Sequence, residues 1–183
     1  MKRALDIILG VIALGLLFPL ILIVALAVCA EDGGPAIFRQ RRVGRLGAQF
    51  SVLKFRSMTV GSGERPSAQA GDLRITRVGK FIRRMNIDEL PQLVNVLFGE
   101  MSLVGPRPAL ASQTVLITLR ERNGASRCRP GLTGLAQVEA YDGMPEDEKA
   151  KYDGIYASRI SFRGDLTLIV RTLAYIIRRP PVY

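Results

Sequence analysis

The chain has 183 residues and carries 26 lysines and arginines against 16 aspartates and glutamates, a formal net charge of +10. This length suits one domain with a real core, and the charge indicates an anionic partner: a nucleic acid, an anionic lipid or a phosphorylated substrate. The absence of histidine excludes Ser-His-Asp catalysis, histidine metal sites and imidazole acid–base chemistry. Cys29 and Cys128 are too few for a disulfide framework and are typical of a reducing compartment.

An uncharged apolar segment runs from Ile7 to Ala30. As a straight helix it would measure roughly 36 Å, enough to cross a bilayer core and too long for a signal peptide. Pro19 lies at its middle, where proline kinks or breaks a helix. Both flanks contain basic residues, which favour the cytoplasmic side of a membrane: Lys2, Arg3, Arg39, Arg41, Arg42 and Arg45. The residues leave two topologies open, a spanning helix and a helix-break-helix that enters and leaves by one leaflet.

A short β-hairpin is predicted next, with strands at Phe38–Val43 and Phe50–Phe55 and a glycine-containing turn between them. The small and polar residues 60–72 predict a loop. Leu73–Met85 alternates basic and apolar positions and predicts an amphipathic helix, which suits either an anionic membrane surface or the outside of a soluble core.

Three further helices are predicted from apolar periodicity and end signals. The first covers Pro91–Phe98 and ends at Gly99; the second covers Ala109–Arg122 and ends at Asn123-Gly124. The third covers Leu166–Arg179 and is stopped by Pro180-Pro181.

Asp88 and Glu89 are adjacent and stand immediately before Leu90-Pro91. Carboxylates at a helix start commonly serve only as caps, which stabilise a helix by about 0.5–2 kcal/mol. The functional alternative is that one carboxylate attacks phosphorus while the other holds Mg²⁺ together with the phosphates of a substrate. A helix N-terminus also favours the phosphate itself.

Several cationic residues accompany the two carboxylates: Lys54, Arg56, Arg83, Arg84, Arg107 and Arg129. Phosphoryl transfer needs fixed positive charge at the non-bridging oxygens. Arg107 is the sharpest candidate because prolines on both sides restrict its backbone, although a loop arginine in a surface salt bridge is the ordinary alternative. Lys54 and Arg56 would share one strand face. The glycine-containing turn 129–134 could approach a ligand closely, which is a weak signal.

Three strings carry a family resemblance: LKFRSM at Leu53–Met58, IDELPQLVNVLFGEMSLVGPRPAL at Ile87–Leu110 and RPGLTGLAQV at Arg129–Val138. Over nearly its whole length the chain resembles the bacterial sugar transferases, monotopic phosphoglycosyl transferases that begin glycan assembly on undecaprenyl phosphate. The resemblance implies a UDP-sugar donor, a polyprenyl phosphate acceptor, release of UMP, and Mg²⁺ as cofactor with Mn²⁺ as a substitute. It also implies a location at the cytoplasmic face of the bacterial inner membrane.

The resemblance assigns roles to individual residues. Asp88 matches the nucleophile that forms a covalent phosphosugar intermediate, and Glu89 matches its partner, which engages Mg²⁺. The substrate phosphates are expected to bind Lys54, Arg56, Arg83, Arg107, Arg129 and Gln137. The membrane segment matches a re-entrant helix-break-helix with Pro19 at the break. Two positions depart from the family pattern: Phe18 replaces a small hydroxylated residue, and Glu139-Ala140-Tyr141 follows Gln137-Val138.

We therefore expect an α/β fold, mostly helical with a small β-hairpin and interfacial amphipathic helices. Residues 1–32 would form a re-entrant membrane hairpin, and residues 33–183 a compact catalytic domain on the membrane surface. The alternative is a non-catalytic basic protein that binds lipid surfaces, which explains the charge and the anchor but not the paired carboxylates. Nucleic-acid binding is disfavoured, since the chain has no tryptophan and no recognition motif. A homodimer is compatible with the sequence. The sequence does not identify the sugar that is transferred.

Overall fold

The structure, a computed structural model, describes residues 2–60, 75–139 and 144–178. Within these ranges the fold is mostly helical with two small two-stranded sheets, as predicted for the class. The elements in chain order are α1 (Lys2–Asp32), β1 (Ile37–Val43), β2 (Gln49–Phe55), α2 (Arg77–Arg84), α3 (Gln92–Phe98), β3 (Ser102–Val104), α4 (Thr114–Arg122), β4 (Gly131–Thr133), α5 (Leu135–Val138), α6 (Glu146–Ser158) and α7 (Phe162–Arg178).

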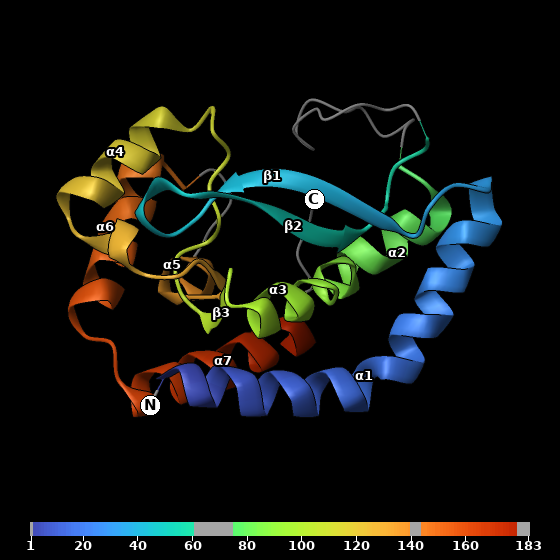
Figure 1. The fold of residues 1–183 in the computed structure, drawn as a ribbon, viewed down its shortest axis with the longest axis horizontal. Coiled ribbons are helices and arrows are strands. Elements are labelled where there is room, and N and C mark those ends of the chain that lie inside the picture. Colours follow the sequence, from blue (N-terminus) through green and yellow to red (C-terminus); the bar gives the residue numbers. More distant parts are fainter. Residues whose placement is uncertain (1, 61–74, 140–143, 179–183) are drawn as a thin grey trace.

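The apolar segment forms a single helix, α1, of 31 residues with Pro19 inside it. Its mean hydropathy reaches 3.1, so its length and composition would allow it to cross a membrane. Figure 1 shows that α1 bends: its first part runs below α3 and α7, and the remainder turns up toward the start of β1. The predicted break at Pro19 is a bend within a continuous helix, because a proline removes one backbone hydrogen bond while the neighbouring turns can keep theirs.

The start of α1 is bonded to the folded part of the chain. The Lys2 ammonium pairs with Asp165 of α7 at 2.6 Å, and the Arg3 guanidinium donates to the last carbonyls of α3. Asp6 is 2% exposed and accepts hydrogen bonds from the hydroxyl of Ser102 at 2.9 Å and from the main chain of β3. The Arg3 bonds satisfy carbonyl groups that the end of α3 otherwise leaves without partners.

The end of α1 is bonded to the same body. Glu31 accepts from the backbone N–H groups of Arg77 at 2.6 Å and Val78 at 3.1 Å, so its carboxylate caps the start of α2. Asp32 pairs with the Arg56 guanidinium through contacts of 2.5 and 2.9 Å. Between these two anchored ends lies a row of exposed apolar side chains that includes Ile12, Leu16, Phe18, Ile23 and Leu26.

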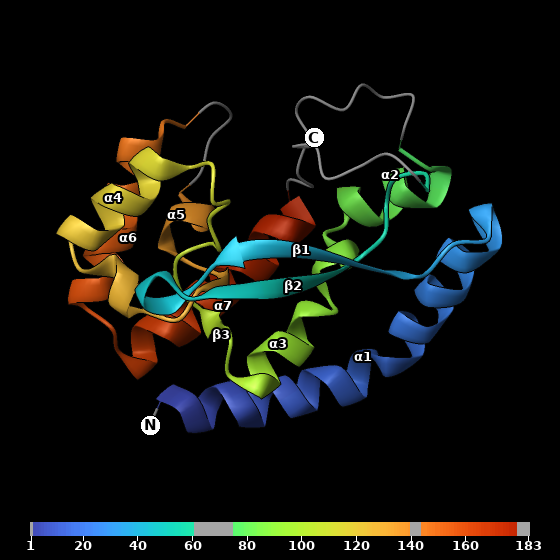
Figure 2. The same cartoon turned by 45° about the horizontal axis from the view of Figure 1, so that its top comes forward.

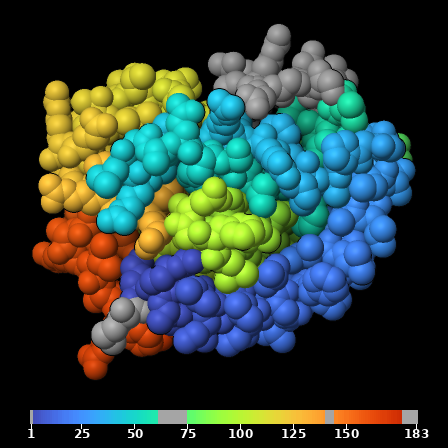
Figure 3. All heavy atoms as spheres, in the orientation of Figure 1, coloured from blue at the N-terminus to red at the C-terminus, as the bar shows by residue number. Residues whose placement is uncertain are grey.

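The predicted hairpin is confirmed. β1 pairs antiparallel with β2 over residues 37–43 and 49–55, and the inner face of the hairpin packs on α3, with Val52 against Val96. Asn95 of α3 bonds to the β2 backbone, accepting from Leu53 at 3.0 Å and donating to Ser51 at 2.8 Å. Figure 3 shows the α3 region, in yellow-green, bounded by the hairpin in cyan and by α1 in blue.

β3 and β4 form a short parallel pair that the sequence did not predict. The sequence of segment 129–134 predicts a turn that could approach a ligand. Its glycines instead allow two backbones to approach each other: a Cβ on Gly131 would lie 2.1 Å from the nitrogen of Gly105, and a Cβ on Gly134 would lie 2.1 Å from the oxygen of Gly105. The glycines therefore serve strand packing.

α4, α5 and α6 lie at the end of the hairpin away from α2, and α7 runs from that end toward the middle of the molecule (Figures 1 and 2). α4 begins at Thr114, later than predicted, because Ala109 forms a β-bridge with Val43. α6 was not predicted, and α7 begins at Phe162, earlier than predicted. From residue 61 onward the predicted loop 60–72 lies outside the described residues, as do Ala140-Tyr141 and Pro180-Pro181.

Candidate active site

The two carboxylates lie on a 3-10 turn, Ile87–Glu89, between α2 and α3. Asn86 before them is left-handed, with φ 55, a conformation that asparagine adopts more readily than most residues. Pro91 is the N-cap residue of α3 and makes no side-chain hydrogen bond to the helix. The hydrogen bonds of the described residues join neither carboxylate to a helix N–H, so the capping interpretation does not explain the pair.

Glu89 is the centre of an ion-pair cluster. Its Oε1 accepts from Lys54 Nζ at 2.7 Å and from Arg107 Nη2 at 2.5 Å, while its Oε2 accepts from Arg107 Nη1 at 3.3 Å. Burial raises the pKa of Glu89, but Arg107 and Lys54 outweigh it and hold that pKa well below its usual range. Glu89 therefore remains an anion that orients both cations.

Asp88 is buried like Glu89 but has different surroundings. It is 8% exposed, and its Oδ1 has no hydrogen-bond partner among the described residues. Burial and repulsion by Glu89 raise the pKa of Asp88 to about 6, although Lys54, Arg107 and Arg83 oppose the shift. Two neighbouring carboxylates whose pKa values are shifted in opposite directions are typical of an active site in which each carboxylate has a different role.

Three of the six predicted cationic and amide residues act on this pair: Lys54, Arg83 and Arg107. Lys54 comes from β2, Arg107 from the loop after β3 and Arg83 from the last turn of α2, where its Nε donates to Ser57 at 2.7 Å. The Arg107 side chain is 46% exposed, whereas the Glu89 side chain is only 11% exposed. Arg107 thus lies on the solvent-exposed side of the Glu89 carboxylate.

Arg56 and Arg129 lie elsewhere. β2 ends at Phe55, so Arg56 does not share a strand face with Lys54; its guanidinium bonds to Asp32 and to the Val28 carbonyl of α1. Arg129 donates from Nε to the carbonyl of Gly99 at 2.9 Å, at the end of α3. In this structure both arginines connect structural elements and neither contacts the paired carboxylates.

Gln137 lies on α5, and both its amide nitrogen and its amide oxygen are buried without a hydrogen-bond partner in the part of the chain that the structure describes. The oxygen lies 2.8 Å from the position that a Cβ on Gly134 would occupy. An amide in this state can still donate one hydrogen bond and accept another.

Arg42 of β1 is a residue near the carboxylates that the sequence placed only among the basic flanks of the membrane segment. Its guanidinium donates to the Pro108 carbonyl at 3.2 Å, and it interacts electrostatically with Arg107 and Glu89. The strand alternation could have found it, because Arg42 and Lys54 lie on the same face of the hairpin.

The carboxylates fit a magnesium ion that arrives with its substrate. Among the described residues no three Asp, Glu, Cys or His side chains form a metal-binding group. Mg²⁺ commonly takes one or two protein carboxylates and fills its other positions with phosphate oxygens and water. Glu89 Oε2, with its one long contact, can supply such a carboxylate oxygen.

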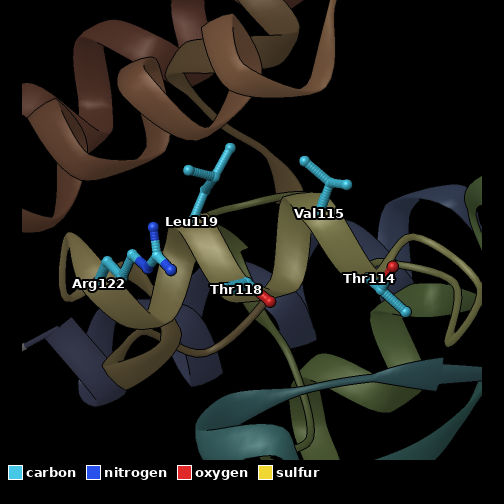
Figure 4. Close-up of a pocket in the computed structure, with 5 residues that line it drawn as sticks. All are labelled: Thr114, Val115, Thr118, Leu119 and Arg122. Atoms are coloured by element: carbon cyan, nitrogen blue, oxygen red, sulfur yellow. The ribbon is translucent and has the colours of Figure 1, made fainter.

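A shallow hollow on the outer face of α4 lies away from these residues. Figure 4 shows the side chains that line it: Thr114, Val115, Thr118, Leu119 and Arg122. None of the predicted site residues lines it, and we assign it no role.

A model of the bacterial sugar transferases matches residues 1–179. The UDP-glucose:undecaprenyl-phosphate glucose-1-phosphate transferase of Caulobacter vibrioides is 42% identical over 100% of this chain, which covers 72% of that protein. The UDP-N-acetylgalactosamine-undecaprenyl-phosphate N-acetylgalactosaminephosphotransferase of Aeromonas hydrophila is 40% identical over 96% of this chain and 43% of its own length. The undecaprenyl-phosphate galactose phosphotransferase of Salmonella typhimurium is 36% identical over 100% of this chain, which spans 42% of that protein.

Proposed function

Because the chain belongs to the bacterial sugar transferase family, we propose that it moves a phosphosugar from a UDP-sugar to undecaprenyl phosphate and releases UMP. The observation that carries the proposal is the unlike pair of carboxylates: Asp88 has a buried oxygen without a described partner, while Glu89 beside it is held by two cations. The similar proteins act, by their names, on glucose, galactose and N-acetylgalactosamine, so the sugar stays open.

The reaction has two displacements at one phosphorus. Asp88 Oδ1 attacks the phosphorus that bears the sugar, the bond to the bridging oxygen breaks, and UMP leaves with that oxygen. The product is an acyl phosphate between Asp88 and the sugar. An oxygen of undecaprenyl phosphate then attacks the same phosphorus, the acyl–phosphate bond breaks, and the Asp88 carboxylate is regenerated as the polyprenyl diphosphosugar leaves.

The environment of Asp88 supports this role. A pKa of about 6 leaves most of the carboxylate ionised at neutral pH, and the lack of a hydrogen bond to Oδ1 leaves that oxygen able to attack. Lys54 and Arg107, oriented by Glu89, provide positive charge for the non-bridging oxygens. Glu89 would hold a bound magnesium ion, which supplies further positive charge for the phosphate oxygens.

The arrangement of α1 supports a site on one membrane face. Both of its ends bond to the same folded body, and its exposed middle is apolar. A helix that spans the bilayer would place its ends on opposite sides, so we place the segment in one leaflet, at the cytoplasmic face of the inner membrane, toward which its basic flanks point.

The test is release of UMP from UDP-sugars by the purified chain in detergent with polyprenyl phosphate and Mg²⁺. We expect UMP with at least one of UDP-glucose, UDP-galactose and UDP-N-acetylgalactosamine, and none with excess EDTA or with the Asp88→Asn variant. A protein that only adsorbs to lipid would release no UMP from any donor, and that outcome would contradict the proposal.

A further inference from the structure

The loop that carries Arg107 is held through its carbonyl groups. Its two prolines have no N–H to donate, so the carbonyls are the groups through which the loop backbone can be fixed. Four consecutive carbonyls accept hydrogen bonds from separate donors: Pro106 from Gly131 N at 2.8 Å, Arg107 from Arg120 Nη1 at 2.9 Å, Pro108 from Arg42 Nη1 at 3.2 Å and Ala109 from Val43 N at 2.9 Å.

The two side-chain donors differ in how their charge is balanced. Arg120 is 8% exposed, and its charge is balanced by an ion pair with Asp153. Arg42 is held by a neutral group instead: its Nε at 3.0 Å and its Nη2 at 2.6 Å both donate to Gln40 Oε1. Gln40 thereby fixes the plane of the guanidinium, which forms no ion pair among the described residues.

Arg42 retains donors for a ligand. The guanidinium has five N–H groups, and three of them donate to Gln40 and Pro108. The described residues provide no partner for the other two, and the side chain is only half-buried. A planar guanidinium with two remaining N–H groups matches the oxygens of a phosphate.

The excess of positive charge around the two carboxylates favours binding of an anion. Four cations, Lys54, Arg83, Arg107 and Arg42, lie near the two carboxylates. Burial and the Arg107 guanidinium lower the pKa of Arg42 to about 10, so the arginine remains charged at neutral pH and is repelled by its neighbour. A bound phosphate would relieve that repulsion.

The positions of the cations along the hairpin indicate which phosphate. Lys54 bonds directly to Glu89 and pairs across the hairpin with Phe38. Arg42 lies further along the same face of β1 and bonds to the Pro108 carbonyl. Arg42 is therefore farther than Lys54 from the paired carboxylates. In an in-line displacement the leaving group lies opposite the attacking oxygen, so the more distant cation suits the phosphate that departs.

We infer that Arg42, oriented by Gln40, binds the departing phosphate of the nucleotide and positions the Arg107 loop beside it. The inference rests on the proposed function, because the departing group is UMP only if the donor is a UDP-sugar.

The test measures binding of UMP to the full chain in detergent by calorimetry, together with kcat and KM for the UDP-sugar. Arg42→Gln should weaken UMP binding about tenfold or more, equivalent to about 1.4 kcal/mol, and raise KM. The matched control is Arg41→Gln, the same change of charge at the next residue, whose side chain is exposed on the other face of β1. We expect it to bind UMP within about twofold of the wild type.

Further variants separate contact from positioning. Arg42→Lys keeps the charge without the fork and should recover only part of the UMP affinity. If Arg42→Gln does not fold, Gln40→Ala provides the test: it leaves the charge but releases the guanidinium plane, and it should weaken UMP binding measurably. Arg42→Gln with lowered kcat but unchanged UMP affinity would overturn the phosphate contact.

The outcomes also separate this inference from the proposed function. If the wild type turns over while Arg42→Gln binds UMP as well as Arg41→Gln, the inference is wrong and the function stands. If the wild type binds UMP through Arg42 but releases none from any UDP-sugar and lipid, the function is wrong and the phosphate site stands.

Discussion

Asp88 and Glu89 are adjacent in the chain, yet their surroundings give them opposite acidities. Burial raises the pKa of both side chains. The ion pairs of Glu89 with Lys54 and Arg107 outweigh it, whereas Asp88 forms no ion pair within the part of the chain that the structure describes and is also repelled by Glu89. The consequence is that one carboxylate organises cations and the other keeps an oxygen for chemistry.

The raised pKa of Asp88 predicts that replacing this carboxylate with an amide stabilises the fold. Its pKa is 3.8 in the unfolded chain and about 6 in the folded one, so protonated Asp88 stabilises the fold. That contribution is fully present below pH 3.8 and is lost as the pH rises through about 6. Asp88→Asn should therefore raise the free energy of unfolding by about 3 kcal/mol at pH 7 and by much less at pH 4.

Thermal unfolding in detergent at both pH values measures this difference, and Asp147→Asn in α6, exposed in the structure, provides the control. An equal effect of Asp88→Asn at pH 7 and pH 4 would show that the Asp88 carboxylate is not destabilised by its surroundings.

Arg107 should not tolerate replacement by lysine. Its two terminal nitrogens both reach Glu89, and the same planar fork would bind a phosphate. Arg107→Lys keeps the charge but not the fork, so kcat/KM should fall about tenfold or more while the melting temperature changes little. A loss under about threefold would make Arg107 an ordinary loop arginine.

At the level of elements, local sequence signals predicted the hairpin and α3 well. Alternation placed both strands within a residue of their bounds, and Pro91 and Gly99 marked the ends of α3. The paired carboxylates and the Pro-Arg-Pro loop were also evident, because their chemistry resides in adjacent residues.

The sequence did not predict features that depend on tertiary contacts. β3 and β4 are three residues each, too short for a periodic pattern, and they pair across a gap in sequence that contains α4. Arg56 and Arg129 have the same local appearance as Lys54, but the end of β2 and the end of α3 give them other partners. Only the fold separates an arginine at the site from one that ties a strand segment to the end of a helix.

Arg56 is expected to affect stability rather than substrate binding. Its guanidinium ties the end of α1 to the hairpin through Asp32 and Val28. Arg56→Gln should therefore lower the melting temperature by several degrees while leaving UMP binding within about twofold of the wild type. Arg39→Gln, an exposed position on β1, is the control of equal charge change. A stable Arg56→Gln variant with strongly weakened UMP binding would instead support the predicted phosphate role of Arg56.

At the scale of the whole molecule, α1 and the folded body form one unit. Lys2, Arg3 and Asp6 fix the start of the helix, and Glu31 and Asp32 fix its end. The bend at the middle brings both ends to the same body (Figure 1). The lipid-facing and substrate-facing parts are therefore held in a fixed relation, which suits an enzyme whose acceptor is embedded in lipid.

This geometry predicts that both ends of α1 face the cytoplasm. In a chain without Cys29 and Cys128, single cysteines at Ala4 and Arg39, both exposed positions, should react with an impermeant maleimide only when it is supplied from the cytoplasmic side. The same labelling with Pro19→Ala should move Ala4 toward the opposite side, because a straighter helix favours spanning. If the cysteines at positions 4 and 39 react from opposite sides in the chain that retains Pro19, the helix spans the membrane.

The central claim is that Asp88 carries the phosphosugar, and trapping that species tests it most directly. The full chain is incubated with a UDP-sugar labelled in the sugar, without lipid, and the denatured protein is analysed by mass spectrometry. We expect one phosphosugar on the peptide that contains Asp88, released UMP in equal amount, and loss of the label when undecaprenyl phosphate is added. Asp88→Asn should carry none. Unlabelled wild-type protein that still turns over with lipid, with sequential rather than ping-pong kinetics, would contradict the claim and indicate direct transfer between the two substrates.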